Sequence, residues 1–209
     1  MLFRSTVNII GENRNYTILY NDTGEYATPP VWITSGSLQN LTIYAKDNNT
    51  VTPSRDGYAV HLDLNFDENT EKRKCEISNC TIKSDWNNAI GCGTHDGSVY
   101  DIHDCTLITT KQNIETFKAH QGNGQSGISI INFNRNICHA ELIDGKPYPP
   151  FEVYFHNAGH DVLETCKVIV NATNNILFRC SNLPTGFEYG DRNYGNSVAK
   201  MNTLIAVDY

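Results

Sequence analysis

Short runs of alternating apolar and polar residues fill the chain, and several of them are versions of one pattern. The clearest copies read apolar, polar, Asn or Asp, apolar or Cys, Thr, apolar, and they lie within residues 37–43, 76–82 and 101–107. Alternation with a period of two indicates a half-buried β-strand. Looser copies follow at residues 130–134 and 163–168. A motif that returns every roughly 20–50 residues predicts a repeat architecture.

One position of this repeat is expected to face the interior, and in successive copies it holds these residues: Leu41, Cys80, Cys105, Phe133 and Cys166. The position before it carries Asn79 in one copy and Asp104 in the next, after His103. Asn79 begins a glycosylation sequon, but Asn and Asp favour turns. We therefore interpret Asn79, His103 and Asp104 as corner residues of the chain path.

A second series of strand patterns precedes the first. It occupies residues 30–34, 58–63, 88–93, 115–120 and 152–157, and each copy is followed by a loop. No helical stretch lies between the strands, so a βαβ unit is disfavoured. Stacked coils of parallel strands use such a pattern. We predict an all-β, right-handed parallel β-helix of about six to seven rungs; a β-propeller is the main alternative, but its blades are more even in length.

Length and composition are consistent with one domain over residues 1–209, with residues 176–209 as an irregular last rung and terminal cover. The first rung has no preceding cap, so a longer natural chain is expected. The net charge of −7 argues against a nucleic-acid groove, which needs a basic stripe. No signal peptide or membrane span is evident.

The seven cysteines are predicted to be mainly buried thiols and not a disulfide framework. Several take the inward position of the repeat, where Cys acts as a small hydrophobic residue, and their number is odd. Cys75 and Cys80 flank one strand, so a bond between them remains an alternative. No zinc-ligand spacing occurs, and we expect neither a metal nor another cofactor.

The rungs at residues 37–43, 76–82 and 101–107 resemble those of the pectin-lyase-like right-handed parallel β-helix superfamily. The rung at residues 58–63 is similar to those of phage and prophage tail proteins, which bind or degrade cell-surface glycans. The resemblance covers roughly residues 7–170 and rests mostly on structural positions. It implies the fold, and it implies a polysaccharide as the partner.

Residues 7–19 show a narrower similarity to an early rung of pectinesterases. On that resemblance Asp96 corresponds to the general acid, Glu115 to the nucleophile and Arg192 to the positioning charge, with His95 where the family has Gln. Each motif is altered, because the nucleophilic Asp is replaced by Glu and Pro-Trp by Asn-Tyr. Moving a nucleophile by about 1 Å costs orders of magnitude in rate.

The ends of the first-series strands predict a polar stripe, because equivalent residues of a β-helix stack. Its expected members are Asp63, Gly93, His120 and Asn157, with Lys118, Glu115, His95 and Asp96 beside them. Two carboxylates such as Asp63 and Asp96 suit acid/base work on a glycosidic bond if their separation fits. The same groups suit hydrogen bonding to sugar hydroxyls, or simply a solvated face. No acidic cluster of the kind that calcium-dependent chemistry needs is evident.

Aromatic residues provide the binding alternative, since rings stack on sugar faces. The candidates are Trp32, Tyr58, Trp86, Tyr100, Tyr148 and Tyr154, and Trp86, placed in a loop, is predicted to be the most exposed. Three functions therefore remain open. The first is a phage- or prophage-type tail or surface-adhesion module that binds polysaccharide on a virion tail or cell surface, with a homotrimer as its candidate assembly. The second is a polysaccharide depolymerase or pectinesterase-like hydrolase, and the third is a structural spacer.

Overall fold

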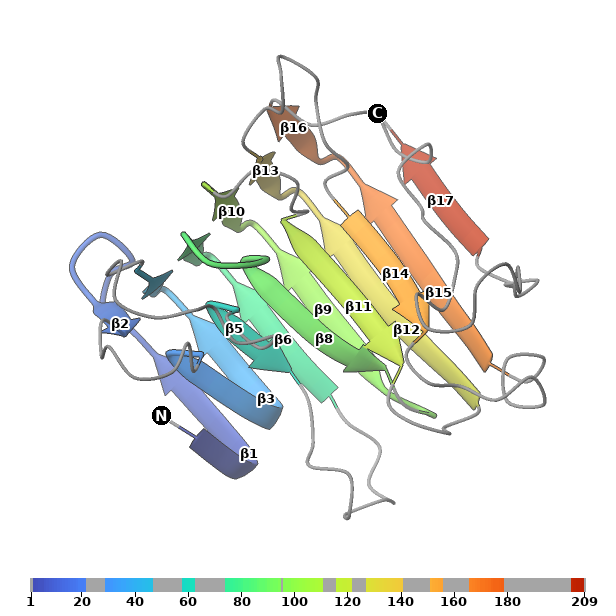
Figure 1. Ribbon diagram of the computed structural model, residues 1–209, viewed down its shortest axis with the longest axis horizontal. Helices are drawn as coiled ribbons and strands as arrows, with labels where there is room; N and C mark the ends of the chain where they lie inside the picture. Colours follow the sequence, from blue (N-terminus) through green and yellow to red (C-terminus); the bar gives the residue numbers. More distant parts are fainter. Residues whose placement is uncertain are drawn as a thin grey trace.

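The computed structural model describes residues 2–21, 29–46, 58–62, 74–94, 96–110, 116–121, 127–140, 151–155, 166–178 and 204–208. These residues form β-strands that pair in parallel throughout, in two sheets (Figure 1). One sheet is strongly curled, so that two ribbons of it and the second sheet form three ribbons around a common interior. The parallel β-helix predicted from the sequence is confirmed.

Each coil of the chain contributes a strand to each ribbon in turn. The first ribbon contains β5 (Val60–Leu62), β8 (Ile90–Thr94), β11 (Phe117–Gln121) and β14 (Phe151–Phe155). The second ribbon contains the later part of β1 (Leu2–Ile10), whose first residues pair with the start of β3, together with β6 (Lys74–Ser78), β9 (Val99–His103), β12 (Gly127–Asn134), β15 (Cys166–Thr173) and β17 (Leu204–Asp208). The third ribbon is the separate sheet of β2 (Ile18–Asn21), β4 (Thr42–Ala45), β7 (Thr81–Ser84), β10 (Thr106–Thr109), β13 (Ile137–His139) and β16 (Ile176–Phe178).

Strand β3 (Val31–Gln39) joins the first two ribbons because it bends in the middle. Its first half pairs with β5 and its second half with β6. The bend lies at Gly36, whose φ is 115°, a value that side chains rarely permit. A Cβ there would lie 1.9 Å from the carbonyl oxygen of Val7 on the neighbouring strand β1. Glycine therefore permits both the bend and the close approach of the two strands.

Inward-facing side chains stack in columns along the axis, because register partners on successive rungs point the same way. One column of the second ribbon runs through Leu38, Ile77, Ile102, Phe133 and Ala172, all of which are buried. Columns from the other ribbons complete a single apolar core. Burial of such surface is the main stabilising term of the fold.

A corner of constant geometry separates the second ribbon from the third. Its five residues, Asn40, Asn79, Asp104, Arg135 and Asn174, all have φ between 50° and 57°. Asn and Asp tolerate this left-handed conformation better than most residues, which explains the repeated Asn or Asp in the sequence. The corner positions predicted for Asn79 and Asp104 are confirmed, and Asn79 Nδ2 donates to Asn40 Oδ1 at 2.7 Å.

The inward position after this corner holds Leu41, Cys80, Cys105, Asn136 and Asn175 in successive rungs; the first four are buried and Asn175 is half-buried. The prediction that Phe133 and Cys166 continue this column is wrong. Phe133 is the register partner of Ile102, and Cys166 is that of Gly127. The repeat pattern predicts an apolar residue at this position, whereas the later rungs have Asn.

Cysteine and asparagine make equivalent contacts in this column. Cys80 Sγ donates to Leu38 O and Cys105 Sγ to Ile77 O, each at 3.5 Å. Asn136 Nδ2 donates to Ile102 O at 2.9 Å, and Asn175 Nδ2 to Phe133 O at 2.8 Å. In each case the acceptor is the corresponding carbonyl of the preceding rung. The Cys and Asn side chains of this column therefore donate hydrogen bonds to main-chain carbonyls even though the column borders the apolar core.

Buried thiols are confirmed for the cysteines that the structure describes in full. Cys75, Cys80, Cys92, Cys105 and Cys138 are free and buried. The alternative bond between Cys75 and Cys80 is thereby excluded. Contact between the stacked Cys80 and Cys105 thiols lowers the pKa of Cys80 and raises that of Cys105.

Candidate functional site

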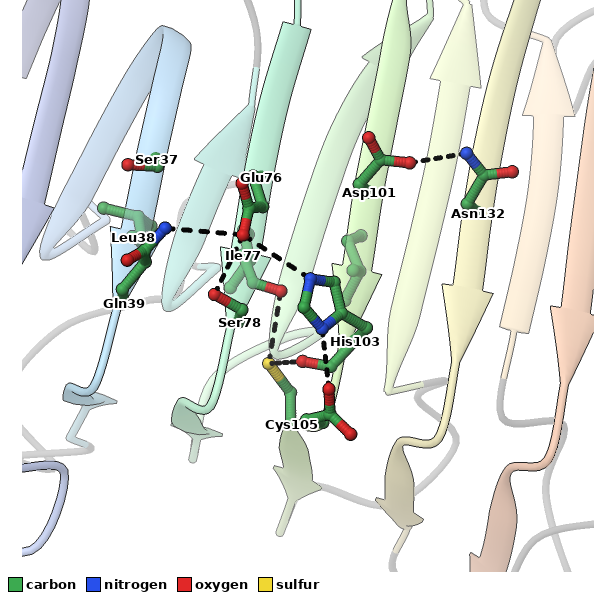
Figure 2. Close-up of polar contacts among 12 residues, drawn as sticks. Ser37, Leu38, Gln39, Glu76, Ile77, Ser78, Asp101, His103, Cys105 and Asn132 are labelled. Atoms are coloured by element: carbon green, nitrogen blue, oxygen red, sulfur yellow. Dashed lines mark hydrogen bonds and ion pairs between the residues drawn. The ribbon is translucent and has the colours of Figure 1, made fainter.

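The outer face of the second ribbon carries two columns of polar side chains in register. The first column runs through Ser37, Glu76, Asp101, Asn132 and Asn171. The second runs through Gln39, Ser78, His103, Asn134 and Thr173. We call these two columns the polar face. Figure 2 shows that its labelled members come from neighbouring strands and lie side by side.

Hydrogen bonds between adjacent rungs hold the C-terminal half of the polar face in place. Asn132 Nδ2 donates to Asp101 Oδ1, and Asn171 Nδ2 donates to Asn132 Oδ1 at 2.8 Å. In the second column the side chains of Asn134 and Thr173 are hydrogen-bonded at 2.6 Å. Because each bond links adjacent rungs, the donors and acceptors are fixed before any ligand arrives.

The carboxylate of Glu76 is the centre of the N-terminal half. Its Oε1 accepts from Ser78 Oγ at 3.2 Å and from Gln39 Nε2 at 3.4 Å. His103 Nε2 lies 3.5 Å from the same oxygen (Figure 2). One carboxylate oxygen thus gathers a hydroxyl, an amide and an imidazole from three successive strands.

Asp104 holds the other side of the imidazole. Its Oδ2 lies 2.7 Å from His103 Nδ1, although side chains of sequence neighbours in a strand point to opposite faces. The left-handed corner at Asp104 turns its carboxylate back towards His103. Arg135, the corner residue of the next rung, binds Asp104 through Nε at 2.8 Å and Nη2 at 2.7 Å.

The charge of this carboxylate is secured by its partners. Hydrogen bonds from Arg135 first, and then His103, hold the pKa of Asp104 well below its usual range. Asp104 in turn raises the pKa of Arg135. An ionised Asp104 accepts a hydrogen bond, so this contact favours the tautomer of His103 with its proton on Nδ1.

A second polar cluster lies at the end of the third ribbon. Tyr44 donates to Asp85 Oδ2, Thr110 donates to Asp85 Oδ1 at 2.7 Å, and Lys83 Nζ lies 3.4 Å from Asp85 Oδ1. The ammonium of Lys83 also sits 4.3 Å from the centre of the Tyr44 ring. Burial, and then Asp85, raise the pKa of Tyr44. The Tyr44 phenol therefore stays protonated and holds the Asp85 carboxylate in place, a structural role and not that of a general base.

Aromatic side chains cover part of the first ribbon. The ring of His61 lies 4.7 Å from that of Trp32 and 4.9 Å from that of Tyr58, between ring centres. Tyr58 packs directly over Gly91, where an added Cβ would lie 2.4 Å from its ring. His61 is buried by this arrangement, while Trp32 remains partly exposed. Of the predicted aromatic candidates, Tyr58 is therefore buried, and Trp32 remains partly exposed beside it.

The structure corrects two aromatic predictions. Trp86 was expected to be the most exposed, yet only 8% of it is accessible, because it packs against the core and its indole N–H donates to Lys46 O at 2.6 Å. Tyr100 faces inward and is fully buried, with its hydroxyl donating to Gly93 O. Neither ring is available for stacking on a sugar.

Only part of the predicted polar stripe falls within the described residues. His95, Glu115, Arg192, Asp63 and Asn157 lie outside them. Gly93 and His120 are register partners on adjacent strands, and Tyr154 is the partner of His120 in the next rung. Lys118 lies between Gly91 and Glu152 in register and is half-buried.

Asp96 is exposed, and its Oδ1 accepts the backbone N–H of Ile128 at 2.9 Å. This contact ties the turn before β9 to the start of β12. The Asp96 carboxylate therefore stabilises this turn.

Sequence reasoning missed the cluster formed by Glu76, Ser78, His103 and Asp104. The signal was present in the alignment of the repeats, since Glu76 and Asp101 take one position, and Ser78 and His103 another. Within the described ranges, no group of three or more His, Cys, Asp or Glu side chains is placed to hold a metal ion. The same part of the chain contains no helix long and apolar enough to cross a membrane.

Comparisons with known proteins identify no relative of this chain. No family model, no curated protein and no solved structure matches the chain. What the structure shows of the expected superfamily is its general architecture, namely parallel strands stacked as in a β-solenoid.

Proposed function

We propose that this β-helix is a surface-adhesion module of the kind found on phage and prophage tails, and that it binds cell-surface polysaccharide along the polar face. One observation carries the proposal: the second ribbon presents two uninterrupted columns of hydrogen-bonding side chains across five successive rungs. Adjacent rungs are about 4.8 Å apart, so the face offers a regular array to an extended polymer.

The chemistry of the polar face suits sugar hydroxyls, each of which donates and accepts. Amide groups of Gln39, Asn132, Asn134 and Asn171 supply donors and acceptors, and carboxylates such as Glu76 supply strong acceptors. Bonds between rungs order these side chains in advance, which lowers the entropy lost on binding. The partly exposed ring of Trp32 offers an additional stacking surface.

Binding to a panel of bacterial and plant polysaccharides tests the proposal. The Asn132→Ala/Asn171→Ala double variant removes two amides from the polar face, and we expect its affinity for the bound polysaccharide to fall at least tenfold, equivalent to about 1.4 kcal/mol. Thr81→Ala is the matched control, because it removes an outward hydroxyl from the third ribbon. Equal loss in both variants, or no binding to any polysaccharide, contradicts the proposal.

The location and assembly expected for such a module are part of the same proposal. A tail or cell-surface protein meets its polysaccharide outside the cell, and three copies side by side would present three polar faces. Sedimentation equilibrium distinguishes a homotrimer from a monomer. A monomer at micromolar concentration would remove the trimer from the proposal and leave the binding face unaffected.

A further inference from the structure

A serine, a histidine and an aspartate come together on the polar face in the arrangement of a hydrolytic triad. Ser78 and His103 are register partners on the adjacent strands β6 and β9. Their side chains therefore leave the ribbon on the same side, with backbones about 4.8 Å apart. Asp104 completes the set through its 2.7 Å contact with His103 Nδ1.

We propose that Ser78, His103 and Asp104 form an esterase site that removes acyl groups from sugar hydroxyls. The substrate class, a carboxylic ester of a carbohydrate, rests on the proposed polysaccharide binding, whereas the reactivity of Ser78 does not. A nucleophile, a base and a group that orients the base are the parts by which such a site is recognised.

The hydroxyl and the imidazole both contact one carboxylate oxygen. Ser78 Oγ is 3.2 Å and His103 Nε2 is 3.5 Å from Oε1 of Glu76 (Figure 2). The proposed reaction requires the serine to turn about its Cα–Cβ bond so that its hydroxyl leaves Glu76 and reaches Nε2. Nucleophile–base hydrogen bonds are often long in the absence of substrate and shorten when it binds.

The surrounding groups supply the remaining functions. Asp104, kept ionised by Arg135, holds the imidazole by Nδ1 and leaves Nε2 to accept a proton. Glu76 lies beside Nε2 and stabilises the imidazolium once it forms. Gln39 is the register partner of Ser78 on the opposite side from His103, so its amide N–H groups can donate to a developing oxyanion.

The reaction balances with water as the only co-reactant. Ser78 Oγ attacks the acyl carbonyl carbon and passes its proton to His103 Nε2, while Gln39 donates to the carbonyl oxygen. The bond between that carbon and the sugar oxygen breaks, and the sugar oxygen takes the proton from His103. Water then attacks the acyl-serine, giving a proton to His103 that returns to Ser78 Oγ. The products are a carboxylic acid and a free sugar hydroxyl.

A fluorophosphonate probe, which labels activated serines, tests the triad without any glycan. We expect mass spectrometry to find the label on Ser78, and p-nitrophenyl acetate to be hydrolysed. Ser78→Ala should abolish labelling, and His103→Gln should slow it by about 10³-fold or more. Asp104→Asn keeps a residue that accepts the left-handed corner but loses the hold on the imidazole, and it should slow labelling by about 10²–10⁴-fold. Thr81→Ala should react as the unmodified protein does.

The outcomes separate this inference from the proposed function. No label on Ser78, or labelling that persists in His103→Gln, overturns the triad even if polysaccharide binds. Labelled Ser78 together with release of acetate from an O-acetylated polysaccharide supports both. Labelled Ser78 in a protein that binds no polysaccharide supports the triad and overturns the carbohydrate substrate. Circular dichroism of each variant confirms that the fold is kept.

Discussion

Asn136 provides the sharpest test of how the corner holds successive rungs together. The residue is fully buried. Its Oδ1 accepts the backbone N–H of Cys105 at 3.0 Å, and its Nδ2 donates to the carbonyl of Ile102 at 2.9 Å. Asn136→Ala removes both contacts, so the buried Cys105 N–H loses its acceptor and the Ile102 carbonyl loses the amide donor.

The expected loss follows from these two groups. The unsatisfied Cys105 N–H costs about 1–3 kcal/mol and the lost hydrogen bond to Ile102 about 1 kcal/mol, so Asn136→Ala should lower the free energy of unfolding by roughly 2–4 kcal/mol. Asn136→Cys is the matched comparison, because Cys80 and Cys105 already donate to equivalent carbonyls in this column. It keeps a weak donor to Ile102 and loses only the acceptor for Cys105, and its penalty should be smaller by about 1 kcal/mol.

Two measurements check this expectation. Hydrogen exchange at the Cys105 amide reports the local bond directly, and we expect faster exchange in both variants. Urea unfolding gives the global loss of stability. If Asn136→Ala shifts stability by less than about 1 kcal/mol and the Cys105 amide stays protected, the corner hydrogen bonds do not stabilise the stack and the reasoning is refuted.

Three further predictions concern other contacts. Gly91→Ala should lower the free energy of unfolding by about 1–3 kcal/mol, because the added Cβ displaces the Tyr58 ring. In a Tyr58→Ala background, thermal melts should show that this loss of stability is gone. Asp104→Asn should lower the free energy of unfolding only slightly at pH 7, because its ion pair with Arg135 is exposed to solvent. Since the folded-state pKa of Asp104 is depressed, that difference should be present above about pH 4 and shrink as the pH falls below it, in urea titrations across pH. Trp86→Phe should lower the free energy of unfolding by about 1 kcal/mol, because it removes the indole hydrogen bond to Lys46. An unchanged melting temperature would contradict a stabilising role for this hydrogen bond.

The sequence was sufficient for the features that depend on local chemistry. Alternation predicted the strands, and the repeated Asn or Asp before an inward residue predicted the corner, since few side chains accept a left-handed backbone. The inward residue was assigned correctly only where it is apolar or Cys. At Asn136, which is buried, and Asn175, which is half-buried, the inward residue is polar and is hydrogen-bonded to the preceding rung. No local pattern distinguishes such a residue from a loop asparagine.

The candidate site was harder to predict because it depends on side-chain direction and register. Adjacent residues of a strand point apart, so the convergence of His103 and Asp104 depends on a backbone angle that the sequence indicates only indirectly. The contact of Ser78 with Glu76, and the place of His103 beside both, require the register between two rungs. Burial of Trp86 likewise depends on Lys46, which is 40 residues away along the chain.

The direction of the corner contacts has a consequence for how the protein is made. Cys80, Cys105, Asn136 and Asn175 each donate to a carbonyl of the rung that precedes them in the chain. A ribosome releases the N-terminal rungs first, at about 5–20 residues per second, so each new corner meets an acceptor that has already emerged. The stack can therefore grow in the order of synthesis, one coil at a time, with the most recent coil as the growing end and every completed coil as its template.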